Sequence, residues 1–170
     1  DYPPGQLTVM VVADGSADAT VEKVNGFNKA RLLFQPERKG KSAAINRAMP
    51  FINSEIVLLT DANCFLETGA LKKMVTCFKD DMVGGVSGAK KVIENLHSNS
   101  TGTGEGIYWK YESFLKKMES SFYTVVGAAG ELFAFRRSLF VLIDETSLTD
   151  DFYLSLSINL QHKIIAYAPG

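Results

Sequence analysis

The sequence predicts an α/β fold in which a mainly parallel central sheet is flanked by helices. Two observations carry this prediction. Short runs rich in Val, Ile and Leu alternate with segments of helical pattern, and turn-forming residues separate them. At 170 residues, with 46% hydrophobic and 22% charged residues, the chain has the size and composition of one globular domain. The net charge of −1 gives no support to a nucleic-acid partner, which usually requires a basic excess.

The first half of the chain alternates strands and helices. Leu7–Ala13 and Ile56–Thr60 are mainly apolar runs of strand length, which is typical of buried strands. Asp18 is a suitable N-cap for a helix that ends near Gly26. Further strands are expected at Arg31–Phe34 and Val83–Ser87, and further helices at Lys41–Met49 and, after a Thr68 cap, Gly69–Phe78.

The second half is less regular. Leu96–Gly106 is rich in Ser, Asn, Thr and Gly and is predicted to be a mobile loop. The expected elements after it are a helix over Ile107–Phe122, a strand over Leu132–Phe135, a helix over Phe152–Leu160 and a strand over Ile164–Tyr167. The aromatic residues Trp109, Tyr111 and Phe114 favour a place in the core over a sugar-binding platform.

Two acidic residues follow predicted strands directly. In a parallel sheet ligands bind beyond the carboxyl ends of the strands, so Asp14 and Asp61 are expected at one edge of the sheet. Asp14 with Gly15 and Ser16 either holds a polar ligand or turns the chain. Asp61 and Asn63 either supply hard oxygen ligands for Mg²⁺ or Mn²⁺ or form a turn.

Two pairs of like charges have a structural and a functional interpretation. Asp150-Asp151 precedes a predicted helix, where the helix dipole favours acidic residues, but an ionised Asp is also a general base. Arg136-Arg137 either clamps phosphate or forms a solvated pair. Both alternatives stay open at the level of the residues.

Several other motifs are excluded or weak. Gly40-Lys41-Ser42 lacks the earlier Gly of a P-loop, and His97 and His162 are too isolated for a zinc site. Cys64 and Cys77 are expected to be buried reduced thiols. No apolar run approaches the ~20 residues of a membrane span, so the chain itself is expected to be soluble. Reduced cysteines and the lack of a secretion signal favour a cytoplasmic location.

Seven segments, in their order along the chain, resemble the inverting family 2 glycosyltransferases with the GT-A fold. They are VVADGSADAT at 11–20, RKGKSAAIN at 38–46, EIVLLTDAN at 55–63, VGGVSG at 83–88, YWKYE at 108–112, GAAGELFAFRR at 127–137 and DDFYL at 150–154. The resemblance implies that 1–170 is a single catalytic domain, in fragment form, that begins after the family's first strand. Residues 1–88 then correspond to the nucleotide-sugar-binding half, and 89–170 to the acceptor-binding half.

The resemblance also implies a role for each matching residue. Asp14, Gly15, Ser16, Lys41 and Asp61 correspond to nucleotide-binding positions. Asp61 and Asn63 are similar to the first and third members of the Asp-x-Asp metal motif, and Asp151 to the catalytic base, with Asp150 beside it. Gly127, Gly130, Arg136 and Arg137 correspond to the acceptor and donor-sugar side.

The implied reaction is transfer of a hexosyl group from a UDP-sugar to a saccharide or lipid-linked acceptor, with a divalent metal, Mg²⁺ or Mn²⁺. It implies a role in polysaccharide or glycolipid synthesis at the cytoplasmic face of the membrane, with membrane contact through segments outside this chain. Two alternatives share the fold: a non-catalytic module that binds sugar nucleotides or saccharides, and a nucleotidyltransferase.

Overall fold

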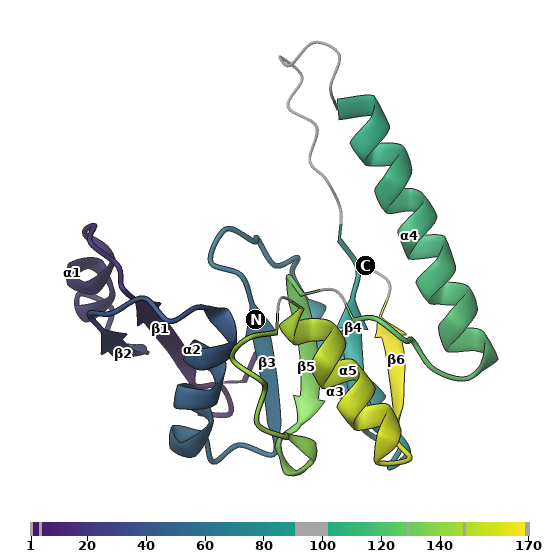
Figure 1. Cartoon of the computed structure of the whole chain (residues 1–170). Coiled ribbons are helices and arrows are strands. Elements are labelled where there is room, and N and C mark those ends of the chain that lie inside the picture. Colours follow the sequence, from purple (N-terminus) through teal and green to yellow (C-terminus); the bar gives the residue numbers. More distant parts are fainter. Residues whose placement is uncertain (1, 4, 91–101, 129, 148, 169–170) are drawn as a thin grey trace. The chain divides into compact units, whose positions relative to one another are not determined.

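The computed structural model describes residues 2–3, 5–90, 102–128, 130–147 and 149–168 (Figure 1). The chain divides into two compact units. The first comprises Asp1–Ser54 and Val141–Asp150, and the second comprises Glu55–Phe140 and Asp151–Gly170. Each unit combines strands with helices, and the predicted α/β class is confirmed.

The first unit is built on a pair of parallel strands. Its elements are β1 (Val9–Asp14), α1 (Thr20–Asn25), β2 (Ala30–Gln35), α2 (Lys41–Ala48) and the 3₁₀ turn η1 (Met49–Phe51). The register pairs Val9 with Ala30 and Asp14 with Gln35. Since the strands are parallel, Asp14 and Gln35 close the same end of the two-stranded sheet.

The second unit contains a four-stranded sheet in the order β3-β5-β4-β6. Its elements are β3 (Ile56–Thr60), α3 (Ala70–Cys77), β4 (Val83–Gly88), α4 (Gly102–Phe122), β5 (Leu132–Arg136), η2 (Arg137–Leu139), α5 (Asp150–Leu160, with Asp150 assigned to the first unit) and β6 (Ile164–Ala168). Every strand predicted from the sequence is present, with boundaries that differ by at most two residues.

The sheet of the second unit is mixed, which corrects the prediction of a mainly parallel sheet. β3, β4 and β6 run in one direction, but β5 is inserted antiparallel between β3 and β4. Two of its three strand pairings are therefore antiparallel. The pattern of apolar runs locates a strand but not its direction, which depends on the end of the sheet to which the preceding connection returns the chain.

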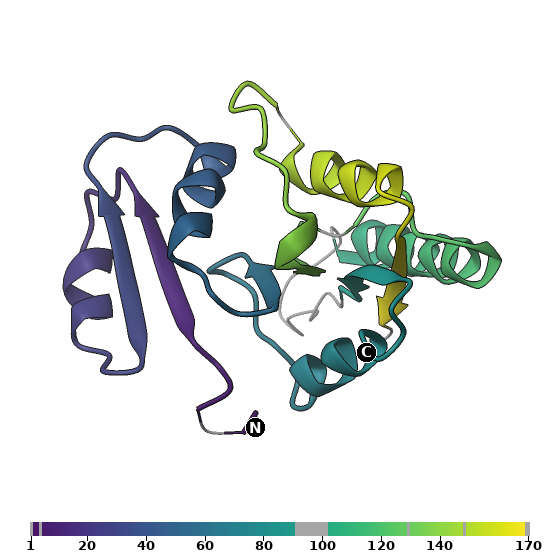
Figure 2. The ribbon, with the colours of Figure 1, turned by 90° about the horizontal axis from the view of Figure 1, so that it is seen from below.

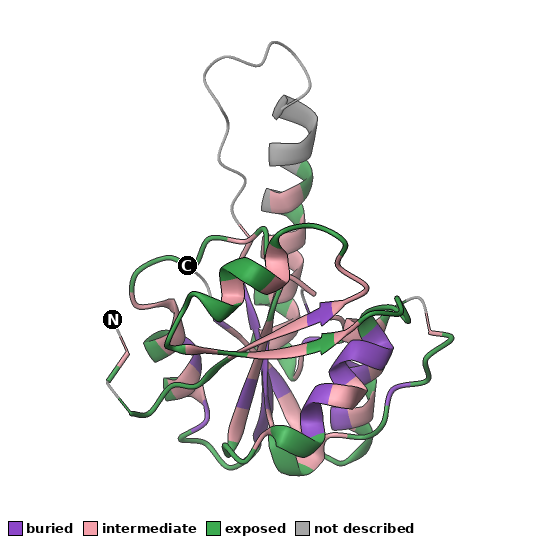
Figure 3. Ribbon diagram, turned by 90° about the vertical axis from the view of Figure 1, so that its left-hand side faces the viewer, coloured by how far each residue is buried: buried purple, intermediate pink, exposed green. Residues whose placement is uncertain are grey.

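The core of the second unit lies on both faces of this sheet. All positions of β4 are buried, and Phe133 and Phe135 of β5 are at most 1% exposed. α3 and α5 cover opposite faces (Figure 2): Met74 of α3 packs in a cluster with Val86 of β4, while Ile158 of α5 lies against Gly84. Figure 3 shows the buried positions gathered on strands and helices, while connecting turns are largely exposed.

Two predicted helix caps differ in the structure. Ala19 is the N-cap of α1, although Asp18 Oδ1 accepts the Thr20 N–H at 3.0 Å, so Asp18 still supports the start of this helix. The N-cap of α3 is Gly69, whose φ of +84° lies in the left-handed region, and no side chain caps it. The Thr68 cap is therefore wrong, because glycine reaches this backbone conformation without strain.

α4 begins earlier than predicted. Of the predicted loop Leu96–Gly106, residues 96–101 lie outside the described residues. Its last five residues, 102–106, belong to α4. Extending an existing helix adds one hydrogen bond per residue, which offsets the poor propensity of glycine.

Tyr111 and Phe114 are each 58% exposed, so the core prediction is wrong for them. No helix among the described residues is long and apolar enough to cross a membrane.

Candidate active site

The register of the second unit brings several predicted site residues to one end of its sheet. Thr60, the last residue of β3, pairs with Leu132, the first residue of β5. Asp61 follows Thr60, and Gly130 lies two residues before Leu132, so both lie at this end. β4 and β6 also finish there, where Gly88 pairs with Ala168. We call this the Asp61 end of the sheet.

Asp61 and Asn63 form a turn whose side chains carry oxygen. The Cys64 N–H donates to the Asp61 carbonyl at 3.1 Å, which confirms the turn interpretation, while Asp61 is half-buried and Asn63 exposed. Within the described residues no three His, Cys, Asp or Glu side chains gather as a metal site. One carboxylate and one amide oxygen nevertheless fit Mg²⁺ or Mn²⁺, which also take oxygen ligands from phosphate and water. The turn and the metal site are thus compatible.

Asp151 lies in the first turn of α5 and faces a glycine. Its Oδ1 accepts the N–H of Phe152 at 2.8 Å. A Cβ placed on Gly130 would lie 2.8 Å from Oδ2 of Asp151 and 3.3 Å from its Cγ. The carboxylate therefore occupies the space that a side chain at position 130 would need, and the structure brings together two residues that the sequence predicted for one site.

A charged cluster beside Gly130 was not predicted from the sequence. Lys90 Nζ lies 2.6 Å from Glu131 Oε1 and 4.0 Å from the centroid of the Trp109 ring. Burial raises the pKa of Glu131, but the hydrogen bond and the charge of Lys90 outweigh it, so the pKa lies below its ordinary value. Lys90 and Glu131 are 41 residues apart. Glu131 lies in the segment 127–137 that resembles the family, but nothing in the sequence around Lys90 indicated this contact.

In the first unit Asp14 is held by its neighbours in space. Its Oδ2 accepts the N–H groups of Lys39 (2.8 Å) and Gly40 (2.7 Å), and its Oδ1 accepts from Arg47 Nη1 (3.3 Å). Partial burial pushes the pKa of Asp14 upward, but the hydrogen bonds from Gly40, Lys39 and Arg47 outweigh it and hold the pKa below its ordinary value. Asp14 thus fixes the loop that leads into α2. Arg47 also donates to Gln35 Oε1, which links the ends of β1 and β2.

The residues after Asp14 form a tight turn. Gly15 has a φ of +68°, and a Cβ there would lie 2.7 Å from the Cβ of Arg38. Glycine is therefore required by both the backbone conformation and the close approach of the 38–40 loop. Gly15 N–H donates to the carbonyl of Gln35 at 2.8 Å, and Ser16 follows it as a half-buried residue.

Lys41 and Asp150 are brought together within the first unit. Lys41 Nζ lies 3.6 Å from Asp150 Oδ2, and the Asp150 side chain is only 14% exposed. Asn46, which the sequence did not single out, pairs with the backbone of Ile143: its amide donates to the carbonyl (2.8 Å) and its oxygen accepts the N–H (2.9 Å). α2 therefore anchors the segment that leads to Asp150. A polar amide amid the buried alanines of α2 was the available signal.

Arg136 and Arg137 lie at the opposite end of the sheet from Asp61, so the structure does not bring them together with the other predicted site residues of this unit. Arg136 pairs with Ile56, the first residue of β3, about 13 Å of strand away from Thr60. The Arg136 guanidinium donates to the carbonyls of Val83 (3.0 Å) and Phe78 (2.7 Å) and to Glu55 Oε1 (2.8 Å). Because β5 is antiparallel, its carboxyl end points away from Asp61. The Arg136 side chain ties the end of α3 to the starts of β3 and β4, whereas Arg137 is exposed and its backbone N–H donates to the Glu55 carbonyl at 2.8 Å.

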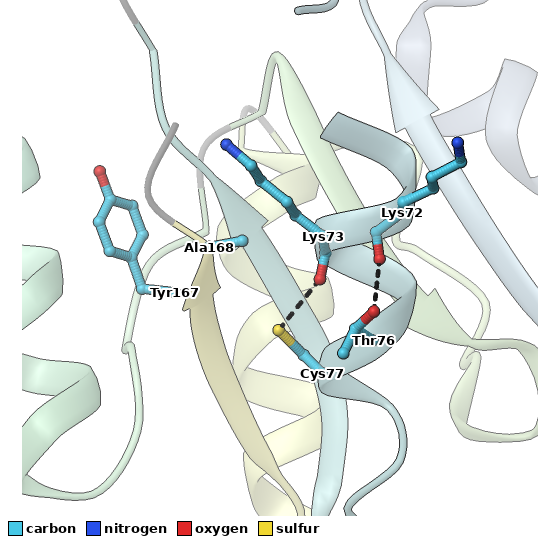
Figure 4. A pocket seen from close by; sticks show the side chains of 6 residues that line it. All are labelled: Lys72, Lys73, Thr76, Cys77, Tyr167 and Ala168. Carbon is cyan, nitrogen blue, oxygen red and sulfur yellow. Dashed lines mark hydrogen bonds between the residues drawn. The ribbon is translucent and has the colours of Figure 1, made fainter. Parts of the chain in front are cut away.

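A shallow, mainly apolar depression between α3 and β6 contains none of the predicted site residues (Figure 4). It is lined by Lys72, Lys73, Thr76, Cys77, Tyr167 and Ala168. The Cys77 thiol lies 3.5 Å from the Lys73 carbonyl, and burial raises its pKa, so the thiol stays protonated. Cys64 and Cys77 are both free, as expected, although each is half-buried rather than buried.

Curated proteins of similar sequence are named as synthases that make glycolipids or polysaccharides. The chain is 27% identical over 173 residues to the beta-monoglucosyldiacylglycerol synthase of Trichormus variabilis, covering 94% of this chain and 36% of that protein. It is 26% identical to the poly-beta-1,6-N-acetyl-D-glucosamine synthase of Staphylococcus aureus, covering 95% and 40%. The chain thus spans little more than a third of the length of these relatives.

Solved structures show the same fold. A mannosyltransferase from Pyrobaculum calidifontis, in complex with GDP-Man and Mn²⁺, superposes with a TM-score of 0.84 at 26% identity, covering 99% of this chain and 47% of that one. S. aureus TarS 1–349 with UDP-GlcNAc superposes with a TM-score of 0.71 at 18% identity, covering 100% and 51%. The family model "Glycosyl transferase family 2" matches residues 1–142. The chain therefore belongs to glycosyl transferase family 2.

Proposed function

We propose that this chain is the catalytic domain of an inverting glycosyltransferase that moves a hexosyl group from a nucleotide sugar to an acceptor hydroxyl. One observation carries the proposal most directly. The carboxylate of Asp151 is held at the start of α5 against Gly130, and Gly130 lies at the same end of the sheet as Asp61. Membership of the family gives this arrangement its chemical meaning, because fold alone does not determine activity.

In the proposed mechanism Asp151 is the general base. Its carboxylate accepts the proton of the acceptor hydroxyl while the hydroxyl oxygen forms a bond to the anomeric carbon and the bond to the diphosphate breaks. A single displacement inverts the configuration at that carbon. Asp61 and Asn63 would hold a divalent cation, which when bound supplies positive charge for the leaving diphosphate. Asp150, with Lys41 at 3.6 Å, would keep the segment before Asp151 in place.

For the nucleotide we propose Asp14, Gly15, Ser16 and Lys41. Three N–H groups donate to the Asp14 carboxylate, which has about four lone-pair sites, so it retains room for one donor from a nucleobase. UDP is the nucleotide that the family resemblance implies. GDP is the competing one, since the Pyrobaculum calidifontis mannosyltransferase is described with GDP-Man.

We further propose that residues 1–88 serve mainly the donor and 89–170 mainly the acceptor, with Gly127 and Gly130 on the sugar side. The relatives' names point to two acceptor classes, a diacylglycerol lipid and a poly-N-acetylglucosamine chain. A saccharide or lipid-linked acceptor, met at the cytoplasmic face of the membrane by the full-length protein, is the corresponding proposal for this one.

Titration calorimetry tests the donor site. UDP and GDP are titrated into the chain with and without Mn²⁺, and the titration is repeated on Asp61→Ala. We expect binding that requires Mn²⁺ and weakens at least about tenfold in Asp61→Ala, because a lost metal ligand costs more than about 1.4 kcal/mol. Asp81→Ala is the matched control, because this exposed aspartate lies just before β4, at the other end of the sheet.

The two nucleotides give distinct outcomes. Tighter binding of GDP than of UDP would reassign the donor but leave the site in place. Binding that is unchanged in Asp61→Ala would remove Asp61 from the metal site. If neither nucleotide binds in the presence of Mn²⁺, the proposed function is contradicted.

A further inference from the structure

We propose that Ser155 is a positioning residue for Asp151, acting through the loop that contains Ala128 and Gly130; this rests on the proposed function of Asp151 as the base. Ser155 lies one helical turn after Asp151 on α5 and is 0% exposed. Such burial of a hydroxyl is costly unless it is hydrogen-bonded. Its two partners connect the helix to the loop.

The hydroxyl of Ser155 makes one bond along the helix and one away from it. It donates to the carbonyl of Asp151 at 2.7 Å and accepts the N–H of Ala128 at 3.0 Å. The first bond is the ordinary contact of a helical serine with the residue four positions earlier. The second joins residues 27 positions apart and supplies the acceptor for a buried backbone N–H, since Ala128 is only 6% exposed.

The backbone that follows this bond limits the space available to the Asp151 carboxylate. Gly130 follows Ala128 by two residues, and a Cβ on Gly130 would lie 2.8 Å from Asp151 Oδ2. On the other side, Oδ1 accepts the Phe152 N–H at 2.8 Å. The carboxylate therefore lies between its own helix turn and the Gly130 backbone. If the loop moves, the wall that limits rotation of the Asp151 side chain moves with it.

Ser157 provides a matched control on the same helix. Its hydroxyl donates to the carbonyl of Tyr153 at 2.6 Å, which is the same contact four residues back, but no bond from its hydroxyl to the loop is present among the described residues. Ser155→Ala and Ser157→Ala thus remove the same kind of helical contact, although the Ser155 bond ends on Asp151 and the Ser157 bond on Tyr153. Only Ser155→Ala also removes the bond to Ala128.

The test measures turnover of UDP-glucose, UDP-N-acetylglucosamine or GDP-mannose, whichever the unmodified chain uses, by release of the nucleoside diphosphate. We expect Ser155→Ala to lower kcat about tenfold, with KM for the donor changed less than about twofold, because a misaligned base slows chemistry more than binding. Ser157→Ala should leave both within about twofold. Amide hydrogen exchange at Ala128 should become faster in Ser155→Ala and stay unchanged in Ser157→Ala.

A second background separates positioning from a general loss of structure. In Asp151→Asn there is no base to position, so adding Ser155→Ala should leave the residual single-turnover rate within about twofold. An equal loss in both backgrounds would overturn the proposal, as would a kcat for Ser155→Ala that matches that of Ser157→Ala.

The contact between Gly130 and Asp151 provides a second test if Ser155→Ala does not fold. Gly130→Ala places a methyl group 2.8 Å from a flexible carboxylate, so the side chain of Asp151 must rotate away, and we expect kcat to fall about thirtyfold. Ser157→Ala serves again as the control, because it changes the same helix without adding volume beside the Asp151 carboxylate. Equal rates for the two variants would overturn the inference. A wild-type chain that turns over no nucleotide sugar would instead contradict the proposed function.

Discussion

Asp14 and Asp151 both carry a carboxylate beside an element end, yet their surroundings differ. Asp14 receives two backbone N–H groups and the guanidinium of Arg47. Among the described residues the Asp151 carboxylate accepts one hydrogen bond, from the next residue in its own helix. Its second oxygen faces a glycine that leaves it space.

The comparison separates a carboxylate that holds the backbone from one that keeps its accepting capacity. Hydrogen bonds to the ionised form stabilise Asp14 as an anion and tie a loop to α2, so that most of its lone pairs serve the fold. A general base needs the opposite, a carboxylate that is fixed in direction but still able to accept a proton. The contacts of Asp151 meet that description. Those of Asp14 use most of its accepting capacity for the fold and leave room for about one further donor.

The largest expected effect is on turnover in Asp151→Asn. An amide of the same shape cannot accept the proton, so kcat should fall about a thousandfold while the affinity for the nucleotide stays within about twofold. Steady-state rates and calorimetric titration of UDP or GDP measure the two quantities. In Asp150→Asn the loss should be smaller, because that change weakens only the contact with Lys41. A larger loss in Asp150→Asn than in Asp151→Asn would transfer the role of base to Asp150.

Arg136 extends the comparison to a residue that serves the fold at the other end of the sheet. Replacing it with Ala leaves the carbonyls of Val83 and Phe78 without their donor, so the free energy of unfolding should fall by about 3 kcal/mol. Denaturant unfolding measures this change. Nucleotide affinity, measured at a temperature where the variant is folded, should be unaltered. A weakened affinity would support a role of Arg136 in binding the donor.

Asp14→Asn tests the structural half of the comparison. An amide NH₂ would face donors where both carboxylate oxygens now accept, and the free energy of unfolding at pH 7 should fall by about 2 kcal/mol. Because folding lowers the pKa of Asp14, the wild-type advantage is complete above the ordinary value of 3.8 and is lost as pH falls through the folded-state pKa.

Urea unfolding of both proteins between pH 7 and pH 3 measures this dependence. A difference that stays constant down to the lowest pH would contradict the proposed bonding of the Asp14 carboxylate. If Asp14→Asn leaves the free energy of unfolding at pH 7 unchanged, the hydrogen bonds to Asp14 do not stabilise the fold.

Much of the local structure was readable from the sequence, and β3 is the clearest case. Ile56–Thr60 is an apolar run of five residues bounded by polar ones, and the strand has those limits. The acidic residue at its carboxyl end could be identified from the same pattern. The prediction failed where one apolar run was compatible with either direction, as in β5. The sugar-side role of Arg136 and Arg137 came from the family resemblance and not from this pattern.

Contacts between distant segments were not predictable in the same way. The pair Lys90–Glu131 and the bond from Ala128 to Ser155 join residues 41 and 27 positions apart. A lysine, a glutamate and a serine in these segments have no periodicity or spacing that distinguishes them from surface residues. Gly130 could be named through the family resemblance, but its contact with Asp151 required the structure.

The sequence by itself determined the α/β class, the positions of the strands, the family and the identity of the acidic residues, because each depends on local composition or on motifs read along the chain. The tertiary structure alone decided that β5 is antiparallel, that Arg136 lies opposite Asp61, that the Asp14 carboxylate is largely engaged and that Asp151 faces Gly130. These facts depend on strand direction and on hydrogen bonds between segments far apart in the chain. Such pairings are selected by the packing of the whole fold, and local sequence patterns do not encode them.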